Sequence, residues 1–477
     1  MPGRTERASR CSSRPGFVRV AHTGAVSSRI AVAALAVLLA GCSLVPPPAR
    51  LPLPAASAPG DAPAGVTTTA PSPTPPPPVA APVAEPIPLP DAELLAEALA
   101  KVSSAGVKTS GVVVIDPASG QTLASRGDKP LIPASTMKVL TSLAAVDTMG
   151  ADTTFATTVV APKPGRLVLV GGGDPLLTDK PSKSAAKPAS LKALADQTVA
   201  ALQAEGVTSV RLGYDTSLFA GPAWHPSWKP AWKVFTARVG ALSINGGRVN
   251  EYQAHSDPAK VAAEAFAARL KDAGIKVTKI APEQSPAGAA PIAEVRSAPL
   301  SEIVGHLLRI SDNHAAEVLG RHVALATGGK PSFEGGAAAI TAWLKAHDLW
   351  ASGMKIDDAS GLSRASKVRP SVLAEALSLA LVTPRWAAVA NGLPVAGVNG
   401  SLKNRFNDPA EKAGRKVVHA KTGTLLGVAS LAGYVTTKDG AVLTFAAMAN
   451  DSGRDSAYNW LDRTATALAK CGCRADS

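Results

Sequence analysis

Two side chains able to act together on an acyl group lie at the start of an apolar segment. Ser135 and Lys138 are three residues apart in PASTMKVLTSLAAV, and residues at that spacing share one face of a helix. A serine at a helix N-terminus faces unpaired N–H groups, which stabilise developing negative charge. A lysine among apolar neighbours is costly unless its charge reaches water or is lost. The pair is therefore a candidate nucleophile with a candidate base; the alternative is a lysine whose stem only covers the helix surface.

A second polar group interrupts a helical region. Ser311, Asp312 and Asn313 stand between two helix-like runs, 300–310 and 314–324. A short break of this kind can project side chains into a cleft. The simpler interpretation of Ser311 is a helix cap, because serine is common at helix termini.

A third group lies on a predicted strand. Lys421, Thr422, Gly423 and Thr424 contain the only K-T-G sequence in the chain. Lys421 and Gly423 face the same side of the strand, because side chains alternate along it. The glycine lets a ligand approach the backbone, and the lysine can bind a carboxylate. An exposed strand end is the alternative.

Two similar patterns elsewhere are expected to be coincidental. Ser184 and Lys187 repeat the serine–lysine spacing in KPSKSAAKPAS, where prolines and lysines indicate a solvated loop. Ser243 and Asn245 repeat the serine–asparagine spacing where a strand-like segment enters a Gly-Gly turn. Neither pattern opens a buried helix.

The N-terminal 90 residues carry export signals. An arginine-rich start leads into an uncharged run of about a dozen residues, shorter than the roughly 20 that span a membrane but typical of a signal peptide. The run ends in Leu-Ala-Gly-Cys42, which resembles a bacterial lipobox, so we expect a signal peptide over 1–42 and a lipid on Cys42; cleavage without a lipid is the alternative. Residues 43–90 contain 17 prolines and predict an extended stalk. These features predict an exported protein at the extracytoplasmic face of a bacterial membrane.

The segments around the three motifs predict an α+β fold that is split by a second domain. A hairpin over 111–125 precedes the first motif, and three antiparallel strands followed by a helix over 455–469 end the chain. Short strands, two helices and a tryptophan-rich loop lie between them. We therefore assign 91–151 and 297–477 to one domain, an antiparallel sheet flanked by helices, and 152–296 to an inserted, smaller α/β domain.

The composition argues against several other classes. The chain has no zinc-site spacing and no basic helix with interleaved aromatics, so we expect no metal, no other cofactor and no nucleic-acid partner. The formal net charge of +13 suits anionic lipids or cell-wall polymers, although ordinary solubility explains it equally well. The four cysteines are too few for a disulfide scaffold. Cys471 and Cys473 can pair with each other, with another chain or not at all.

Together and in this order, the three motifs resemble those of the serine β-lactamases and penicillin-binding proteins. Over 91–470 the sequence is similar to the D-alanyl-D-alanine carboxypeptidases of the penicillin-binding protein 4 type, which carry an insertion between the first two motifs. Supporting stretches are GGDP at 172–175, DASGLSR at 358–364 and GSL at 400–402. The resemblance implies a β-lactamase/transpeptidase-like fold, peptidoglycan stem peptides as substrates and β-lactams as covalent inhibitors.

The resemblance also implies a role for each motif residue. Ser135 attacks the peptide bond between two D-alanines and Lys138, uncharged, accepts its proton; Ser311 and Lys138 then relay the proton to the leaving amine. Backbone N–H groups of Ser135 and Thr424 form the oxyanion hole. The implied substrate-binding residues are Asn313, Lys421, Thr422, Gly423 and Thr424. Burial lowers the pKa of a lysine and a nearby cation lowers it further, and Lys421 is expected to be that cation for Lys138.

Other functions need features that the chain lacks or does not use. A class A β-lactamase needs a glutamate in an E-x-x-L-N context, which neither Glu317 nor Glu334 has. An α/β-hydrolase esterase needs G-x-S-x-G, which is absent. A non-catalytic cell-wall-binding lipoprotein would not need the serine and both lysines. The expected function is a serine D-Ala-D-Ala carboxypeptidase, and D,D-endopeptidase activity stays open beside it.

Overall fold

The computed structural model describes residues 89–184 and 186–473 of the 477-residue chain. The predicted signal peptide, the predicted lipid site at Cys42 and nearly all of the predicted stalk lie outside the described residues. Among the residues that are described, no single helix is long and apolar enough to cross a membrane. Two helices bent by 110° relative to each other, Pro370–Val382 and Pro384–Asn391, reach that length and composition only together.

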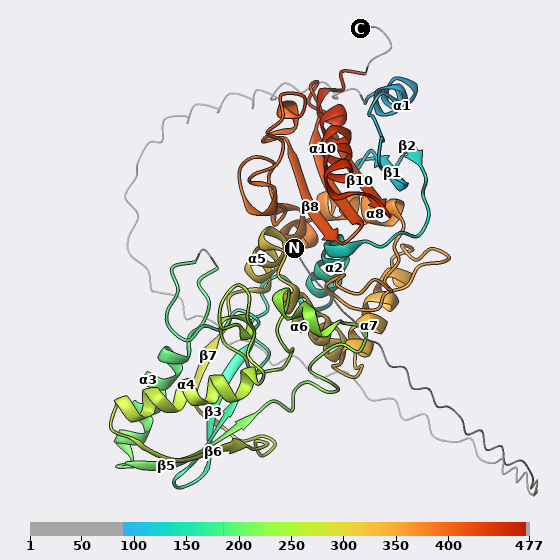
Figure 1. Ribbon diagram of the computed structural model, residues 1–477. Coiled ribbons are helices and arrows are strands. Elements are labelled where there is room, and N and C mark those ends of the chain that lie inside the picture. The colour runs from blue at the N-terminus through green and yellow to red at the C-terminus, as the bar shows by residue number, and fades with distance from the viewer. Residues whose placement is uncertain (1–88, 185, 474–477) are drawn as a thin grey trace, which may run out of the picture. The chain divides into compact units, whose positions relative to one another are not determined.

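Five antiparallel strands form the first sheet, in the order β2-β1-β10-β9-β8 (Figure 1). The order places the first strands of the described chain next to the last, because β1 pairs with β10. The bounds are β1 Thr109–Ile115, β2 Thr122–Arg126, β8 Val418–Leu425, β9 Val428–Thr436 and β10 Val442–Asn450. Both the early hairpin and the three late strands were predicted from sequence, and β8, which carries the third motif, is an edge strand.

Helices cover both faces of this sheet, which explains its continuous apolar strands. Val112 and Val114 point into a core with α1 and α10, whereas Val113 and Ile115 point into a second core with α2 and α5 to α9. Helix α10 lies across the sheet in Figure 1. The bounds are α1 Ala92–Ala100, α2 Met137–Met149, α5 Leu300–Ile310, α6 Asn313–Ala326, α7 Phe333–Ala346, α8 Pro370–Val382, α9 Ala387–Asn391 and α10 Arg454–Lys470. We call this sheet and these helices the main domain.

A second five-stranded sheet, with order β6-β5-β4-β3-β7, lies wholly within 156–296, which we call the insert. Strands β4, β5 and β6 are parallel and are joined by crossover helices, while β3 is antiparallel to β4 and β7. The bounds are β3 Ala156–Lys163, β4 Arg166–Val170, α3 Leu191–Ala204, β5 Ser209–Asp215, α4 Pro258–Asp272, β6 Lys276–Pro282 and β7 Pro291–Arg296. Its own core packs α3 and α4 against the sheet.

The insert leaves and rejoins the main domain at one place. Beside the pairing of its first and last strands, Ser297 N donates to Phe155 O (2.9 Å) and Leu300 N donates to Thr153 O (2.8 Å). The domain boundaries that the sequence predicts, at 151/152 and 296/297, stay predictions.

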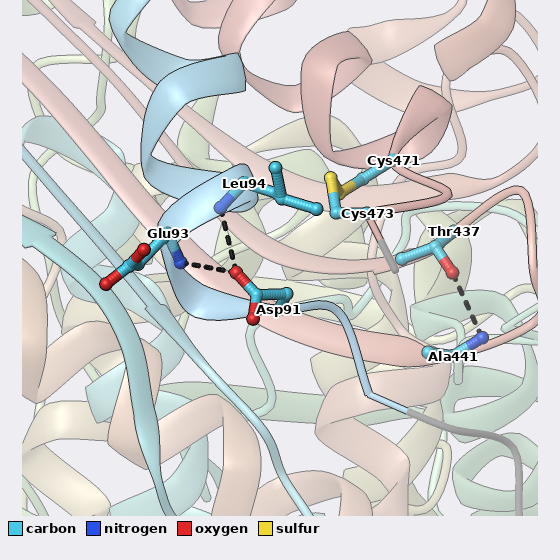
Figure 2. Close-up of a disulfide and its surroundings, with 7 residues drawn as sticks. All are labelled: Asp91, Glu93, Leu94, Thr437, Ala441, Cys471 and Cys473. Atoms are coloured by element: carbon cyan, nitrogen blue, oxygen red, sulfur yellow. Dashed lines mark hydrogen bonds between the residues drawn. A yellow bond between two sulfur atoms is a disulfide. The ribbon is translucent and has the colours of Figure 1, made fainter. Parts of the chain in front are cut away.

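The two ends of the described chain are hydrogen-bonded to each other, and a disulfide lies beside them (Figure 2). Asp91 caps α1, because its Oδ1 accepts hydrogen bonds from Glu93 N (2.9 Å) and Leu94 N (3.0 Å). Its own N–H donates to Cys473 O (2.5 Å). Cys471 and Cys473 form a disulfide with each other, which decides among the three alternatives left open by the sequence.

Candidate active site

Ser135 lies in a tight turn in front of a buried helix. The turn is the 3₁₀ helix Ala134–Thr136, and α2 begins at the next residue, Met137. Ala134 has a φ of 48°, a left-handed conformation that is uncommon for residues other than glycine. Backbone strain of this kind gathers at functional sites. The turn leaves Ser135 partly exposed between buried neighbours.

Lys138 is completely buried, and its Nζ has three hydrogen-bond partners. It donates to Ser135 Oγ (3.1 Å), Asn313 Oδ1 (2.6 Å) and Ser360 O (2.7 Å). Three acceptors match the three protons of an ammonium group. When the group is a neutral amine, its lone pair must face one of them, and Ser135 is the only partner with a proton to give. The geometry therefore favours proton transfer from Ser135 to Lys138.

The surroundings of Lys138 make this transfer possible near neutral pH. Burial lowers the pKa of Lys138 from 10.5 to about 8, although the carboxylates of Asp358, Glu317 and Asp312 oppose that shift. The sequence predicts repulsion by Lys421 as a cause. In the structure the predicted burial lowers the pKa of Lys138, whereas the repulsion between the two lysines adds to burial in lowering the pKa of Lys421 well below its usual value.

The second motif forms the break between α5 and α6. Ser311 ends α5 in a left-handed conformation with a φ of 61°. Asp312 is the N-cap of α6, because its Oδ1 accepts a hydrogen bond from Ala315 N (3.0 Å). Ser311 is thus the C-cap of α5 and Asp312 the N-cap of α6, and the break leaves Asn313 at the start of α6.

Asn313 connects the main domain to the insert. Its Oδ1 accepts from Lys138 Nζ, and its Nδ2 donates to Phe235 O at 3.0 Å. These two bonds fix which way the amide points, since its oxygen only accepts and its nitrogen only donates. The second Nδ2 hydrogen is left for a carbonyl group in the cavity that Asn313 helps to line.

Lys421 and Ser311 form a second polar pair beside the first. Lys421 is completely buried, and its Nζ donates to Ser311 Oγ (2.8 Å) and Thr422 O (2.8 Å). The resemblance predicts a relay between Ser311 and Lys138. In the structure the direct partner of Ser311 Oγ is Lys421 rather than Lys138, so this relay needs a substrate group or a water between the two.

The two threonines of β8 are each held by a hydroxyl from elsewhere in the main domain. Thr422 Oγ1 is 2.7 Å from Ser401 Oγ, and Thr424 Oγ1 is 2.6 Å from Tyr458 Oη. Either oxygen of each pair can be the donor. Both hydroxyls can therefore turn a proton toward an anionic ligand without losing their partner.

Gly423 lets β8 pass beside the nucleophile. A Cβ at this position would lie 2.7 Å from Pro133 O and 3.0 Å from Ser135 N, and it would collide with Ser430 Oγ. Only a glycine permits this approach. The strand therefore runs close to the backbone N–H of Ser135, as an oxyanion hole shared by Ser135 N and Thr424 N requires.

A cavity of about 880 Å³ opens at Ser135. Its lining combines motif residues with apolar and cationic side chains: Ser135, Asn313, Thr424, Leu362, Leu425, Trp232, Phe235, Tyr458, Lys229, Arg364 and Arg454. Apolar walls with a few convergent polar groups are typical of ligand sites. The three cations favour a ligand that carries carboxylates.

Residues outside the three motifs hold the motif residues in place, and sequence reasoning assigned them no role. Ser360 and Ser401 lie in stretches that support the resemblance, but nothing local marks them as partners of Lys138 and Thr422. The contributions of Tyr458 and the Phe235 carbonyl come from distant segments. Spatial proximity of this kind has no signal in a single sequence.

The coincidental patterns do not form a second site. Ser184 and Lys187 lie on an exposed loop, where the bond between them joins Lys187 N to Ser184 O (3.0 Å). Ser243 Oγ contacts His314 Nε2 at 3.1 Å in a buried position. Glu334 is exposed on α7. In the part of the chain that the structure describes, no cluster of three or more metal-binding side chains occurs.

A serine bound to a buried lysine, with a second lysine on the edge strand of a helix-covered antiparallel sheet, defines a serine hydrolase of the β-lactamase-like fold. The family described as D-Ala-D-Ala carboxypeptidase 3 (S13) matches residues 92–253 and 239–470. The chain belongs to this family.

Relatives of known name agree with this assignment. Carboxypeptidase DacB of Mycolicibacterium smegmatis is 35% identical over 382 residues, which cover 76% of this chain and 80% of the relative. A D-alanyl-D-alanine carboxypeptidase of Actinomadura sp. is 30% identical over 426 residues, covering 69% of this chain and 76% of the relative.

A solved structure shares the fold. Penicillin binding protein 4 (dacB) from Haemophilus influenzae matches 80% of this chain and 100% of its own with a TM-score of 0.65 at 21% identity. A second structure of that protein is a complex with a β-lactam. These matches confirm the predicted α+β, β-lactamase/transpeptidase-like fold.

Proposed function

We propose that the protein is a serine D-Ala-D-Ala carboxypeptidase that acts on peptidoglycan stem peptides through an acyl-enzyme. One observation carries the proposal: the buried Nζ of Lys138, whose pKa is lowered to about 8, is 3.1 Å from Ser135 Oγ. Membership of the D-Ala-D-Ala carboxypeptidase 3 (S13) family supports the choice of substrate.

Acylation begins when Ser135 Oγ attacks the carbonyl carbon between the two D-alanines. Lys138 Nζ takes the hydroxyl proton as the new C–O bond forms. The backbone N–H groups of Ser135 and Thr424 stabilise the oxyanion, a contribution of about 3–4 kcal/mol per donor in other serine hydrolases. Asn313 Nδ2 donates its second hydrogen to a carbonyl of the substrate.

The tetrahedral intermediate collapses when the C–N bond breaks. The departing D-alanine amine takes a proton from the Ser311 hydroxyl, which regains one from Lys138 through a water or a substrate group between them. Lys421, Thr422 and Thr424 bind the terminal carboxylate: the Lys421 amine is held by Ser311 Oγ, and the two threonine hydroxyls are held by Ser401 and Tyr458. A water molecule then attacks the ester and releases the shortened stem peptide.

The structure disfavours the β-lactamase alternative. The deacylating glutamate of such an enzyme must reach a water beside the acyl group. Glu317 is buried against the backbone of Ala359 and Ser360, and the cavity at Ser135 has no glutamate in its lining. A β-lactam would therefore form a slowly hydrolysed acyl-enzyme, which supports penicillin binding.

Labelled penicillin tests the proposal directly. The label is expected on the peptide that contains Ser135, to be lost in Ser135→Ala and to remain in Ser184→Ala, which alters the coincidental serine. Digestion of purified peptidoglycan is expected to remove one terminal D-alanine, and mass spectrometry of the products also reveals any cleaved cross-links. A chelator is expected to have no effect. Label on Ser184, or none, would rule the proposal out.

We further propose that the protein is held at the outer face of a membrane by a lipid on Cys42. The lipobox-like Leu-Ala-Gly-Cys42 sequence and the proline-rich stretch after it support this anchoring. Cys42→Ala is expected to stay unprocessed or to leave the membrane fraction, whereas Cys11→Ala, a matched control, is expected to stay anchored. A mature N-terminus that maps elsewhere and carries no lipid would contradict it.

A further inference from the structure

Glu317 sits one turn along α6 from Asn313 and is almost fully buried, at 2% exposure. Its Oε1 accepts a hydrogen bond from Ser360 N (2.8 Å) and its Oε2 accepts one from Ala359 N (3.2 Å). The carbonyl of Ser360 is the third acceptor of Lys138 Nζ, at 2.7 Å. The backbone of Ser360 therefore links the two side chains: its N–H is bound to the Glu317 carboxyl group, and its carbonyl is bound to Lys138 Nζ.

We propose that Glu317 is a positioning residue of the acylation step: it holds the backbone N–H groups of Ala359 and Ser360, so that the carbonyl of Ser360 keeps Lys138 Nζ beside Ser135. The inference rests on the proposed function, because it assumes that Lys138 is the base. It goes beyond that function by assigning a role to a residue outside the three motifs.

The peptide is fixed from its other side as well. Asp358 Oδ1 accepts from Gly361 N (2.9 Å), and Asp358 Oδ2 accepts from Ser363 N (2.6 Å) and Trp228 Nε1 (3.0 Å). Gly361, with a φ of 75°, packs so closely on Ala134 O that a Cβ would collide with it. Residues 358–363 are thus held in place by α6, by the turn before Ser135 and by the insert. Glu317 makes the hydrogen bonds on the side of α6.

Glu317 can play this part without charging the site. Burial, together with the charge of Asp358, raises the pKa of Glu317 and so favours its neutral acid. An ionised Glu317 would raise the pKa of Lys138 and so weaken the base.

Other charged groups face this cluster from each neighbouring element. Arg321 follows Glu317 by one turn on α6, and its pKa is lowered by burial and raised by Glu317. His225 of the insert acts on Asp358, and Asp312 acts on Lys138. A pH-dependent measurement therefore needs a variant that changes Glu317 alone.

The test compares acylation by labelled penicillin across pH 6–9.5 in the wild type, Glu317→Gln, Glu317→Ala and Glu375→Gln. Glu375→Gln is the matched control, because Glu375 is a partly buried carboxyl on α8 of the same domain. Thermal denaturation reports whether each variant folds.

Glu317→Ala leaves two buried N–H groups without a partner and frees the peptide, so acylation is expected to fall on the order of 10- to 100-fold at every pH. Glu317→Gln keeps an oxygen that can accept from Ser360 N, so its acylation rate is expected to fall less. Because glutamine cannot ionise, the acidic limb of the pH profile of Glu317→Gln is expected at lower pH. The acylation rate at pH 7, divided by the rate at pH 9, is therefore expected to rise about twofold or more. The control is expected to match the wild type.

The inference is overturned if Glu317→Ala acylates like the wild type, or if the acidic limb of Glu317→Gln stays in place or moves to higher pH. The profile of Glu317→Gln decides the matter where Glu317→Ala does not fold. If wild-type Ser135 is labelled normally and the Glu317 variants acylate at the same rate and with the same pH profile, this inference alone is wrong. Absence of label on wild-type Ser135 defeats the proposed function, and this inference with it.

Discussion

Replacing Lys138 by arginine is the most direct test of the base assigned to this site. Arginine keeps the positive charge and comparable reach, but it does not deprotonate in proteins. With the pKa of Lys138 at about 8, the neutral fraction of the lysine is about 9% at pH 7 and about 91% at pH 9. An ordinary lysine with a pKa of 10.5 would be about 0.03% neutral at pH 7. Burial thus raises the fraction of usable base about 300-fold, or about 3 kcal/mol.

These fractions give the expected size and pH dependence of the effect. Loss of a general base costs about 10²–10⁴ in rate, so Lys138→Arg is expected to acylate at least about 10²-fold more slowly at pH 7. Wild-type acylation is expected to rise about tenfold from pH 7 to pH 9 as the lysine loses its proton, while the variant stays flat. The deficit should therefore widen about tenfold over that range.

The assay is single-turnover labelling with fluorescent penicillin at pH 7, 8 and 9. Lys187→Arg is the matched control, because Lys187 belongs to the coincidental serine–lysine pattern on an exposed loop. Thermal denaturation separates a folding defect from a chemical one. A variant that acylates within tenfold of the wild type at pH 7, or a deficit that does not widen with pH, would refute the assignment of Lys138 as the base.

Three further substitutions probe the geometry. Gly423→Ala places a methyl group near Pro133 O and Ser135 N, so the acylation rate should drop at least about 100-fold. A rate near that of the wild type would show that β8 need not approach the nucleophile. For Asp312, burial alone raises the pKa, but hydrogen bonding and charge from His306 and nearby groups lower it to about 2. Its ionised form stabilises the fold above about pH 4, and this stability is lost as the pH falls through about 2. Asp312→Asn should therefore lower the free energy of unfolding in urea by about 2 kcal/mol at pH 7 and by almost nothing at pH 2; equal stability at pH 7 would contradict the shift. Tyr458→Phe should raise KM for a D-Ala-D-Ala peptide more than it lowers kcat, because Thr424 loses a hydroxyl partner, and an unchanged KM would count against carboxylate binding there.

Features with a local physical cause could be predicted from the sequence. Asp91 starts α1 because its side chain satisfies the first N–H groups of the helix. The turn at 438–440 separates β9 from β10 because its residues favour a tight reversal. The buried helix after Ser135 follows from its apolar pattern, and burial of Lys138 in turn follows from that helix.

Features that depend on the meeting of distant segments could not be predicted. The sequence placed Lys421 near Lys138 only by resemblance, and it did not show that Ser311 would pair with Lys421. From the sequence, Glu317 was considered only as the deacylating glutamate of a β-lactamase, and it lacks the E-x-x-L-N context of that residue. Its buried role depends on residues more than 40 positions away, and no local pattern encodes that contact.

The narrow junction between the insert and the main domain has a consequence for how the chain can vary. Because Phe155 is bonded to Ser297 and Thr153 to Leu300, the entropy lost in closing this loop depends only weakly on the length of chain between β3 and β7. The length of the insert can therefore vary at little entropic cost, provided that its contacts with the main domain are kept, such as those of Trp228 with Asp358 and of Gly173 with His322. Any replacement must still supply a carbonyl oxygen where Phe235 now meets Asn313.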